Sequence, residues 1–91
     1  MSERDKIEFY KSGMMKFAQQ DFKGALAEFD RAIALDPTYA DVHQSMAHCH
    51  EKLGDLDAAL SCAKTAVEHN PDDFLAHTSL SIFYQRKGMI P

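Results

Sequence analysis

The sequence has little proline, glycine and cysteine, and each scarcity excludes a class of structure. Its 91 residues include three Pro and four Gly, so long uninterrupted helices are possible. Cys49 and Cys62 are too few for a disulfide framework and are expected to be reduced, mostly buried thiols. No apolar run is long enough to cross a bilayer, and the charged start, MSERDKIEFYKSG, has no signal-peptide core. We therefore expect a soluble, cytoplasmic protein with no membrane partner.

The chain also lacks an excess of positive charge. Ten Lys and Arg stand against fourteen Asp and Glu, for a net charge of −4. The absence of a basic patch argues against a nucleic acid as partner. The apolar content of 45% is ordinary for a globular protein and too high for a disordered chain. The length suits one domain over residues 1–91.

A spacing of thirty-four residues organises what is present. Pairs at this offset are Pro37 and Pro71, Ala25 and Ala59, Ala32 and Ala66, Leu26 and Leu60, and Gly54 and Gly88. So many pairs in one register indicate an internal repeat. The repeated alanines lie seven residues apart within each unit, on one helix face where two backbones can approach closely.

Each unit is predicted to form two helices. A stripe typical of an amphipathic helix runs at i, i+4, i+7 and i+11 through Val42, Met46, Cys49 and Leu53. Gly54 suits the left-handed residue that follows a helix end.

The prolines mark where one unit ends and the next begins, because the residue before a proline disfavours helical geometry. After Pro71, Asp72 and Asp73 are predicted to cap the next helix. After Pro37 the candidate cap is Thr38, with Asp41 in the capping-box position.

This pattern resembles the tetratricopeptide repeat, whose consensus is W-x2-L-G-x2-Y, then A-x3-F, then P. The resemblance covers nearly the whole chain and implies repeat 1 at about 6–39, repeat 2 at about 40–73, and a partial repeat 3, first helix only, at about 74–91. It implies an all-α fold, a right-handed superhelical solenoid of antiparallel helix pairs with two repeats and a fifth, C-terminal helix. The matching positions hold Phe9, Ser12, Gly13, Lys16, Ala25, Phe29 and Pro37, then His43, Met46, Ala47, His50, Ala59, Ala63 and Pro71, then His77, Leu80, Ser81 and Tyr84.

The two ends of the predicted array differ. Stacking buries one face of each first helix against the previous unit. In the third unit this face holds Ala76, Leu80, Phe83 and Lys87. In the first unit it is largely polar, so the array is expected to begin there, and its residues are Glu8, Ser12, Met15 and Gln19.

The face of the fifth helix that would meet its own partner helix is a candidate surface for self-association. Its residues are His77, Leu80, Ser81 and Tyr84. The closing stretch, QRKGMIP, repeats the turn before a second helix, with Gly88, Ile90 and Pro91 in the expected places. We therefore expect the chain to stop inside a third repeat.

No catalytic motif is present, neither a Gly-rich phosphate loop nor G-x-S-x-G nor H-E-x-x-H, so we expect no enzyme activity and no cofactor. Metal-capable side chains concentrate at His43, His48, Cys49 and His50. Without a C-x2-C or H-x3-H pair they predict no metal site. His43 and His77 are expected to be packed side chains with one hydrogen bond each. A metal-binding module stays the least favoured alternative.

The resemblance implies a concave groove lined by the first helix of each unit, where family members hold a peptide. In this chain the groove is predicted to carry Ile7, Tyr10, Lys11, Met14 and Phe17, then Asp41, Gln44, Ser45, His48 and Glu51, then Leu75, Thr78, Ser79, Ile82 and Arg86. The apolar residues of the first set exceed what an isolated helix surface needs, which indicates a contact surface.

One family activity is argued against by specific residues. Chaperone-binding members hold an acidic chaperone tail with a carboxylate clamp of Lys, Asn and Arg side chains, which make charge-assisted bonds. The matching places here supply neither a positive charge nor Asn, for they are Tyr10, Met14, Ser45, Leu75 and Ser79. We instead expect a protein-interaction scaffold or adaptor that binds a protein or peptide through apolar contacts, with a basic group facing Asp41 or Glu51. Self-association as a homo-oligomer is the main alternative.

Overall fold

The structure is a computed structural model that describes residues 3–88, so the predicted positions of Ile90 and Pro91 lie outside the described residues. Every regular element in this range is a helix, and none is long and apolar enough to cross a membrane. The helices are α1 (Glu3–Ala18), α2 (Phe22–Leu35), α3 (Ala40–Lys52), α4 (Leu56–His69) and α5 (Phe74–Arg86).

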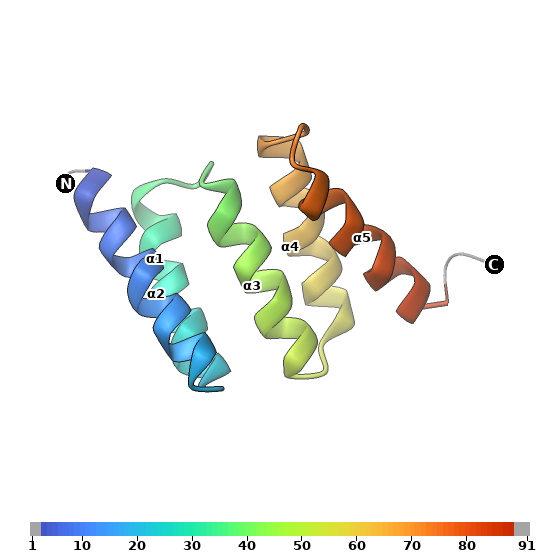
Figure 1. Cartoon of the computed structure of the whole chain (residues 1–91), viewed down its shortest axis with the longest axis horizontal. Helices are drawn as coiled ribbons and strands as arrows, with labels where there is room; N and C mark the ends of the chain where they lie inside the picture. The colour runs from blue at the N-terminus through green and yellow to red at the C-terminus, as the bar shows by residue number, and fades with distance from the viewer. Residues whose placement is uncertain (1–2, 89–91) are drawn as a thin grey trace.

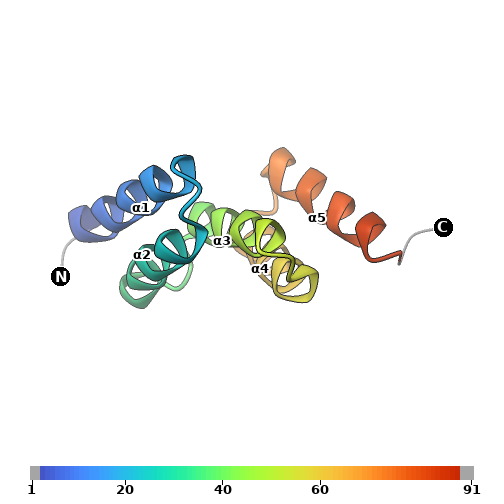
Figure 2. The same cartoon turned by 90° about the horizontal axis from the view of Figure 1, so that it is seen from below.

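Successive helices pack against one another along the chain. Helix α1 packs on α2 and α3 on α4, while α2 contacts α3 and α4 contacts α5. The helices form a row from the N- to the C-terminal end (Figure 1). Seen from below, α1, α3 and α5 lie along one side, and α2 and α4 lie along the other (Figure 2). The predicted all-α solenoid of antiparallel helix pairs is confirmed.

Small residues set how closely the helix pairs approach. The four repeated alanines, Ala25, Ala32, Ala59 and Ala66, are all buried, as predicted. Gly13 in α1 lies so close to Phe29 in α2 that an added Cβ would come within 2.4 Å of its ring. The Phe29 ring is fully buried and cannot give way cheaply. The tight α1–α2 contact therefore depends on glycine at position 13.

The turn inside each repeat has the same backbone shape. Gln20, Gly54 and Gly88 occupy equivalent positions, and all three have a positive φ. In the first two turns the next residue, Asp21 or Asp55, donates its N–H to the carbonyl of Lys16 or His50, at 2.9 Å in both. This is the Schellman arrangement, which satisfies the last carbonyls of a helix. The same two aspartates cap α2 and α4 through their side chains.

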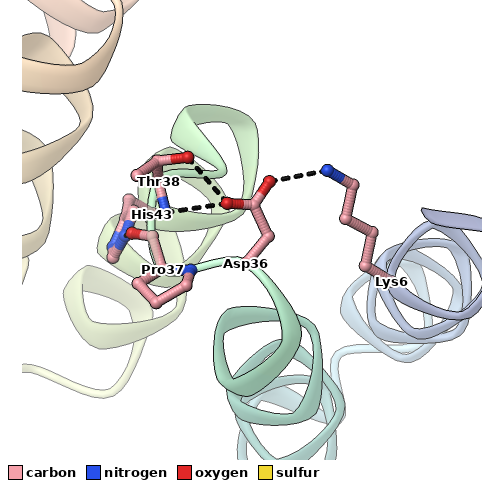
Figure 3. Close-up of polar contacts among 5 residues, drawn as sticks. All are labelled: Lys6, Asp36, Pro37, Thr38 and His43. Atoms are coloured by element: carbon pink, nitrogen blue, oxygen red, sulfur yellow. Dashed lines mark hydrogen bonds and ion pairs between the residues drawn. The ribbon is translucent and has the colours of Figure 1, made fainter. Parts of the chain in front are cut away.

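The predicted cap of α3 is wrong. Its N-cap residue is Tyr39, which makes no capping bond through its side chain. The Thr38 hydroxyl and N–H both donate to one Asp36 oxygen, at 2.6 Å and 3.1 Å, while Lys6 donates to the other oxygen at 2.6 Å (Figure 3). Thr38 thus turns back to the preceding aspartate, which competes with the helix for its hydroxyl. At the next junction Asp73 caps α5 as predicted, because its carboxylate accepts from the N–H groups of Leu75 and Ala76.

The Asp36 carboxylate ties the start of α1 to the end of α2. The hydrogen bond from Lys6, followed by those from Thr38, lowers the pKa of Asp36 from 3.8 to about 2. Lys6 also lies over the Tyr39 ring, with its Nζ 5.2 Å from the ring centroid. These contacts hold the α1–α2 pair against the α2–α3 loop.

The faces predicted to stack between repeats are buried for most of their length. Val42 and Cys49 of α3 and Phe83 of α5 lie in the core. The prediction fails at the last position of each stripe, since Leu53 is 43% exposed and Lys87 is also exposed. The reason is geometric, because both residues are the C-caps of their helices, where the helical stripe ends. Lys87 pairs there with Asp57 of α4, at 2.7 Å between Nζ and Oδ1.

Candidate functional site

The concave side of the molecule is formed by α1, α3 and α5, and α1 and α5 rise on either side of α3 (Figure 2). The predicted groove residues fall into three groups by exposure. The exposed group is Ile7, Lys11, Met14, Asp41, Leu75, Thr78, Ile82 and Arg86. The half-buried group is Tyr10, Phe17, Gln44, Ser45, His48 and Glu51. Ser79 is buried.

A hollow of about 290 Å³ lies between α1 and α3, lined by Met14, Phe17, Ser45 and His48. We call it the Met14–Phe17 hollow. All four lining residues belong to the predicted groove. Met14 is 39% exposed, and its sulfur accepts a 3.5 Å hydrogen bond from the Ser45 hydroxyl. A thioether and two ring side chains give the hollow mainly apolar walls. It is large enough for one apolar side chain of a partner.

The interface between α3 and α5 contains a side-chain contact at the same repeat positions as the Ser45–Met14 contact between α1 and α3. Ser79 is the repeat equivalent of Ser45, and His48 is the equivalent of Met14. The Ser79 hydroxyl lies 3.4 Å from His48 Nε2, as the Ser45 hydroxyl lies 3.5 Å from the Met14 sulfur. His48 also meets the edge of the Phe83 ring at 5.7 Å between centroids. Ser79 therefore supports helix packing, and the expectation that its side chain lines an open groove needs correction.

Glu51 is not available to a basic partner group. Its carboxylate forms an ion pair with Arg86 of α5, and only 14% of its side chain is exposed. Asp41, in the first turn of α3, is exposed and makes no ion pair within residues 3–88. Of the two acidic groups expected to face a partner, Asp41 alone remains open.

Tyr10 contributes mainly to the fold. Its ring lies 6.1 Å from that of Phe29 and 5.4 Å from that of Tyr39, measured between centroids. Both neighbours belong to the first core cluster or pack against it. Aromatic pairs of this geometry add to the stability gained from burial. A substitution at Tyr10 would therefore disturb the α1–α2–α3 junction as well as the groove.

The surface of α5 that faces away from α3 is only partly covered within residues 3–88. His77 and Ser81 are exposed, while Leu80 and Tyr84 are half-buried against α4. Tyr84 is less exposed than expected because Lys64 of α4 lies over its ring at 5.4 Å. A hollow of about 540 Å³ between α4 and α5 includes both of these residues.

The exposed aromatic on this helix is Phe74, which is 80% exposed and was absent from the sequence prediction. The repeat register shows only that Phe74 is equivalent to Lys6. The structure adds that Lys6 lies on the side of α1 that faces its partner helix, where it bonds Asp36. Phe74, His77, Ser81 and Tyr84 thus repeat the α1 stripe that faces α2. We call these four residues the α5 outer stripe.

The metal-capable side chains do not come together. Within residues 3–88 no three His, Cys, Asp or Glu side chains are grouped to hold a metal ion. His43 and His77 each place Nε2 on a proline carbonyl, Pro37 at 2.7 Å and Pro71 at 2.6 Å, which is the expected single hydrogen bond. His43 is half-buried, but His77 is exposed, so the expectation of a packed side chain fails there.

The two cysteines are free thiols held in the protonated form. Burial raises the pKa of Cys49 to about 11 and also raises the pKa of Cys62. The thiolate is the reactive form, so burial makes both cysteines poor nucleophiles near neutral pH.

Comparison with known proteins agrees with this architecture. The tetratricopeptide repeat family model matches residues 16–81, more than half of the chain. The chain therefore belongs to the tetratricopeptide repeat family.

Two solved structures described as crystal structures of MamA superpose on 96% of the chain, with TM-scores of 0.89 and 0.88 and 24% sequence identity. This likeness shows the fold. The chain spans about half the length of these structures, 51% of one and 48% of the other.

Proposed function

We propose that this chain is a non-catalytic scaffold that binds a segment of another protein on its concave side, mainly through apolar contacts. The observation that carries the proposal is the hollow lined by Met14, Phe17, Ser45 and His48. Met and aromatic side chains are enriched at protein interfaces. Membership in a family of helical repeats supports the same function, because stacked repeats present extended concave surfaces for binding.

The outer helices of the concave side, α1 and α5, both expose apolar side chains. Ile7 and Met14 of α1 are 38% and 39% exposed, and Leu75 and Ile82 of α5 are 66% and 45% exposed. The floor provided by α3 is more polar, with Asp41 and Gln44. A bound segment would therefore place apolar side chains against the walls and polar groups over α3.

Affinity capture with matched variants tests this function. Met14→Asp puts a charge into the hollow, whereas Met15→Asp puts the same charge about 100° around α1, outside the hollow, where Met15 is 65% exposed. We expect wild type and Met15→Asp to retain the same protein from a cell extract, and Met14→Asp to bind it at least about tenfold more weakly, as for loss of an interface hot spot. Equal retention by the two variants would count against groove binding, and circular dichroism melts check that both remain folded.

Self-association is a second candidate, supported by the α5 outer stripe. Ser81 is equivalent to Gly13 and Ala47, which are buried where α1 and α3 meet their partner helices. A small residue at 81 leaves room for another helix to approach as closely. The occupant proposed for this surface is a second copy of the chain.

A further inference from the structure

The concave side carries a positive charge that nothing in the described chain neutralises, and it adjoins the apolar hollow. A second hollow of about 440 Å³ is lined by Phe17, Ala18, Gln20, Phe22 and Lys52. Phe17 lines both hollows, so the two are neighbours. The lining of the second hollow comes from the end of α1, the α1–α2 turn, the start of α2 and the last residue of α3.

The repeat register shows that Lys52 lacks the acidic partner that its equivalent residue has. Lys52 is equivalent to Arg86, and Phe17 is equivalent to Glu51. Between α3 and α5 the cation of Arg86 is met by the carboxylate of Glu51. Between α1 and α3 the same place opposite Lys52 is taken by Phe17. The α1–α3 interface therefore lacks the ion pair found between α3 and α5. It has an aromatic side chain, Phe17, in place of the carboxylate, and the cation of Lys52 lies beside it.

No acidic residue of the described chain substitutes for the missing partner of Lys52. Within residues 3–88 Lys52 makes no ion pair. The acidic residue of the adjoining turn, Asp21, is already engaged, because its carboxylate accepts from the Gly24 N–H at 3.0 Å and lies 4.0 Å from Lys16 Nζ. Lys52 is exposed and available to a group from outside the chain.

We infer that the segment bound on the concave side carries an internal Asp or Glu, which pairs with Lys52 while a neighbouring apolar side chain fills the Met14–Phe17 hollow. The inference rests on the proposed groove-binding function and adds a charge requirement to it. Asp41 stands at the other end of α3 with no ion-pair partner in residues 3–88. Along α3 the exposed charges thus run from acidic at Asp41 to basic at Lys52, with Lys11 of α1 as a further exposed cation on the neighbouring wall, and this order favours one direction for a segment that carries both charges.

Helix geometry sets the spacing of the recognised groups. Positions 41 and 52 are separated by eleven residues of α3, which at 1.5 Å per residue is about 16 Å. An extended chain covers that length in about five residues at 3.3 Å each. The expected pattern is a basic residue and an acidic residue about five positions apart, with an apolar residue between them, over Ser45 and His48.

Selection from a random heptapeptide library displayed on phage tests this inference. The peptides are fused at their C-terminus, so any carboxylate they offer comes from a side chain. Wild type should enrich peptides with an apolar residue and an Asp or Glu two or three positions away. Lys52→Glu should lose the acidic preference and favour Lys or Arg there, while the apolar preference remains. The matched control is Lys23→Glu, which reverses the charge of an exposed lysine on a different helix, α2. It should select the same peptides as wild type.

The outcomes separate the two proposals. If wild type enriches no peptide over Met14→Asp, the proposed groove function fails and the charge requirement fails with it. If apolar peptides are enriched without an acidic preference, or if Lys52→Glu selects the same acidic residue as wild type, the charge requirement alone is overturned. For a selected peptide, Lys52→Gln should raise Kd about two- to fivefold, the range for an exposed ion pair, and Lys23→Gln should leave it unchanged.

Discussion

Gln20 ends α1 in the conformation that glycine takes at the equivalent turn positions. Its φ is 64°, against 87° for Gly54 and 74° for Gly88. A side chain in the left-handed region costs about 1–2 kcal/mol, and glycine avoids this cost but loses more entropy on folding. Gln20→Gly should therefore stabilise the chain by about 0.5–1 kcal/mol and raise Tm by a few degrees in a thermal melt. The reciprocal change, Gly54→Gln, should lower Tm, and an unchanged Tm in both variants would contradict the role assigned to this turn.

Asp36 makes the stability of the α1–α2 pair depend on pH. Its pKa is lowered from 3.8 to about 2 in the folded chain, first by Lys6 and then by Thr38. A carboxyl with a lowered pKa stabilises the fold above its unfolded pKa, and this stabilisation is lost as pH falls from about 4 toward 2. We expect Asp36→Asn to be less stable than wild type at pH 7, with the difference shrinking across that window.

Urea denaturation at pH 7, 4 and 2.5 measures this difference. Lys6→Met removes the largest cause of the lowered pKa, so it should also flatten the acid-dependent part of the stability. A difference between wild type and Asp36→Asn that stays constant down to pH 2.5 would show that the carboxylate contributes nothing specific.

At the scale of the helix, the two junctions between repeats begin their next helices differently. Helix α5 starts with a side-chain cap from Asp73, whereas α3 starts at Tyr39 without one. Asp73→Ala should cost about 1 kcal/mol, the usual value of such a cap. Because α5 packs mainly on α4, the loss should appear as faster amide exchange in α5 before the rest of the chain.

Hydrogen exchange followed by mass spectrometry checks this prediction. Thr38→Ala is the matched variant, and it should leave the start of α3 as protected as before, since Thr38 bonds Asp36 and does not cap the helix. Equal losses of protection in α3 and α5 would argue against the difference between the two caps.

At the scale of the whole molecule, the solenoid offers two separate surfaces, and the α5 outer stripe is the one suited to a second copy. Ser81→Arg should prevent close approach of another helix without disturbing α5, because Ser81 is exposed. Ile82→Arg, at an exposed position on the concave side of α5, is the control. Sedimentation velocity over a range of concentrations should show a dimer for wild type and Ile82→Arg that is lost in Ser81→Arg. A monomer at every concentration would remove self-association as a candidate.

The two surfaces also make independent predictions for the molecule as a whole. Met14→Asp acts on the concave side and should leave the mass in solution unchanged. Ser81→Arg acts on the α5 outer stripe and should leave groove binding unchanged. Substitutions in a repeat fold that share no contacts are expected to act additively, so the double variant should lose both properties together.

The thirty-four-residue register was enough to predict helix pairs, buried alanines and the left-handed turn at Gly54, because these depend on local spacing and on small residues at one face. The four residues that line the hollow between α1 and α3 are among the fifteen that the family resemblance placed in the groove. Exposure could not be assigned in the same way. Tyr10 is half-buried against Phe29 and Tyr39, and Ser79 is buried beside His48 of α3. How much each side chain is covered depends on how far successive helix pairs are rotated.

What the sequence by itself determined is therefore the repeat, its helices and the family to which it belongs, since periodicity and small residues act within one unit. Only the tertiary structure decided which charges are satisfied. Glu51 and Arg86 come from different repeats and meet across an interface, while Lys52 lines a hollow with Phe17 and makes no ion pair in the described chain. Ion pairing depends on distances of a few ångströms between helices, and such distances are set by packing and not by position along the chain.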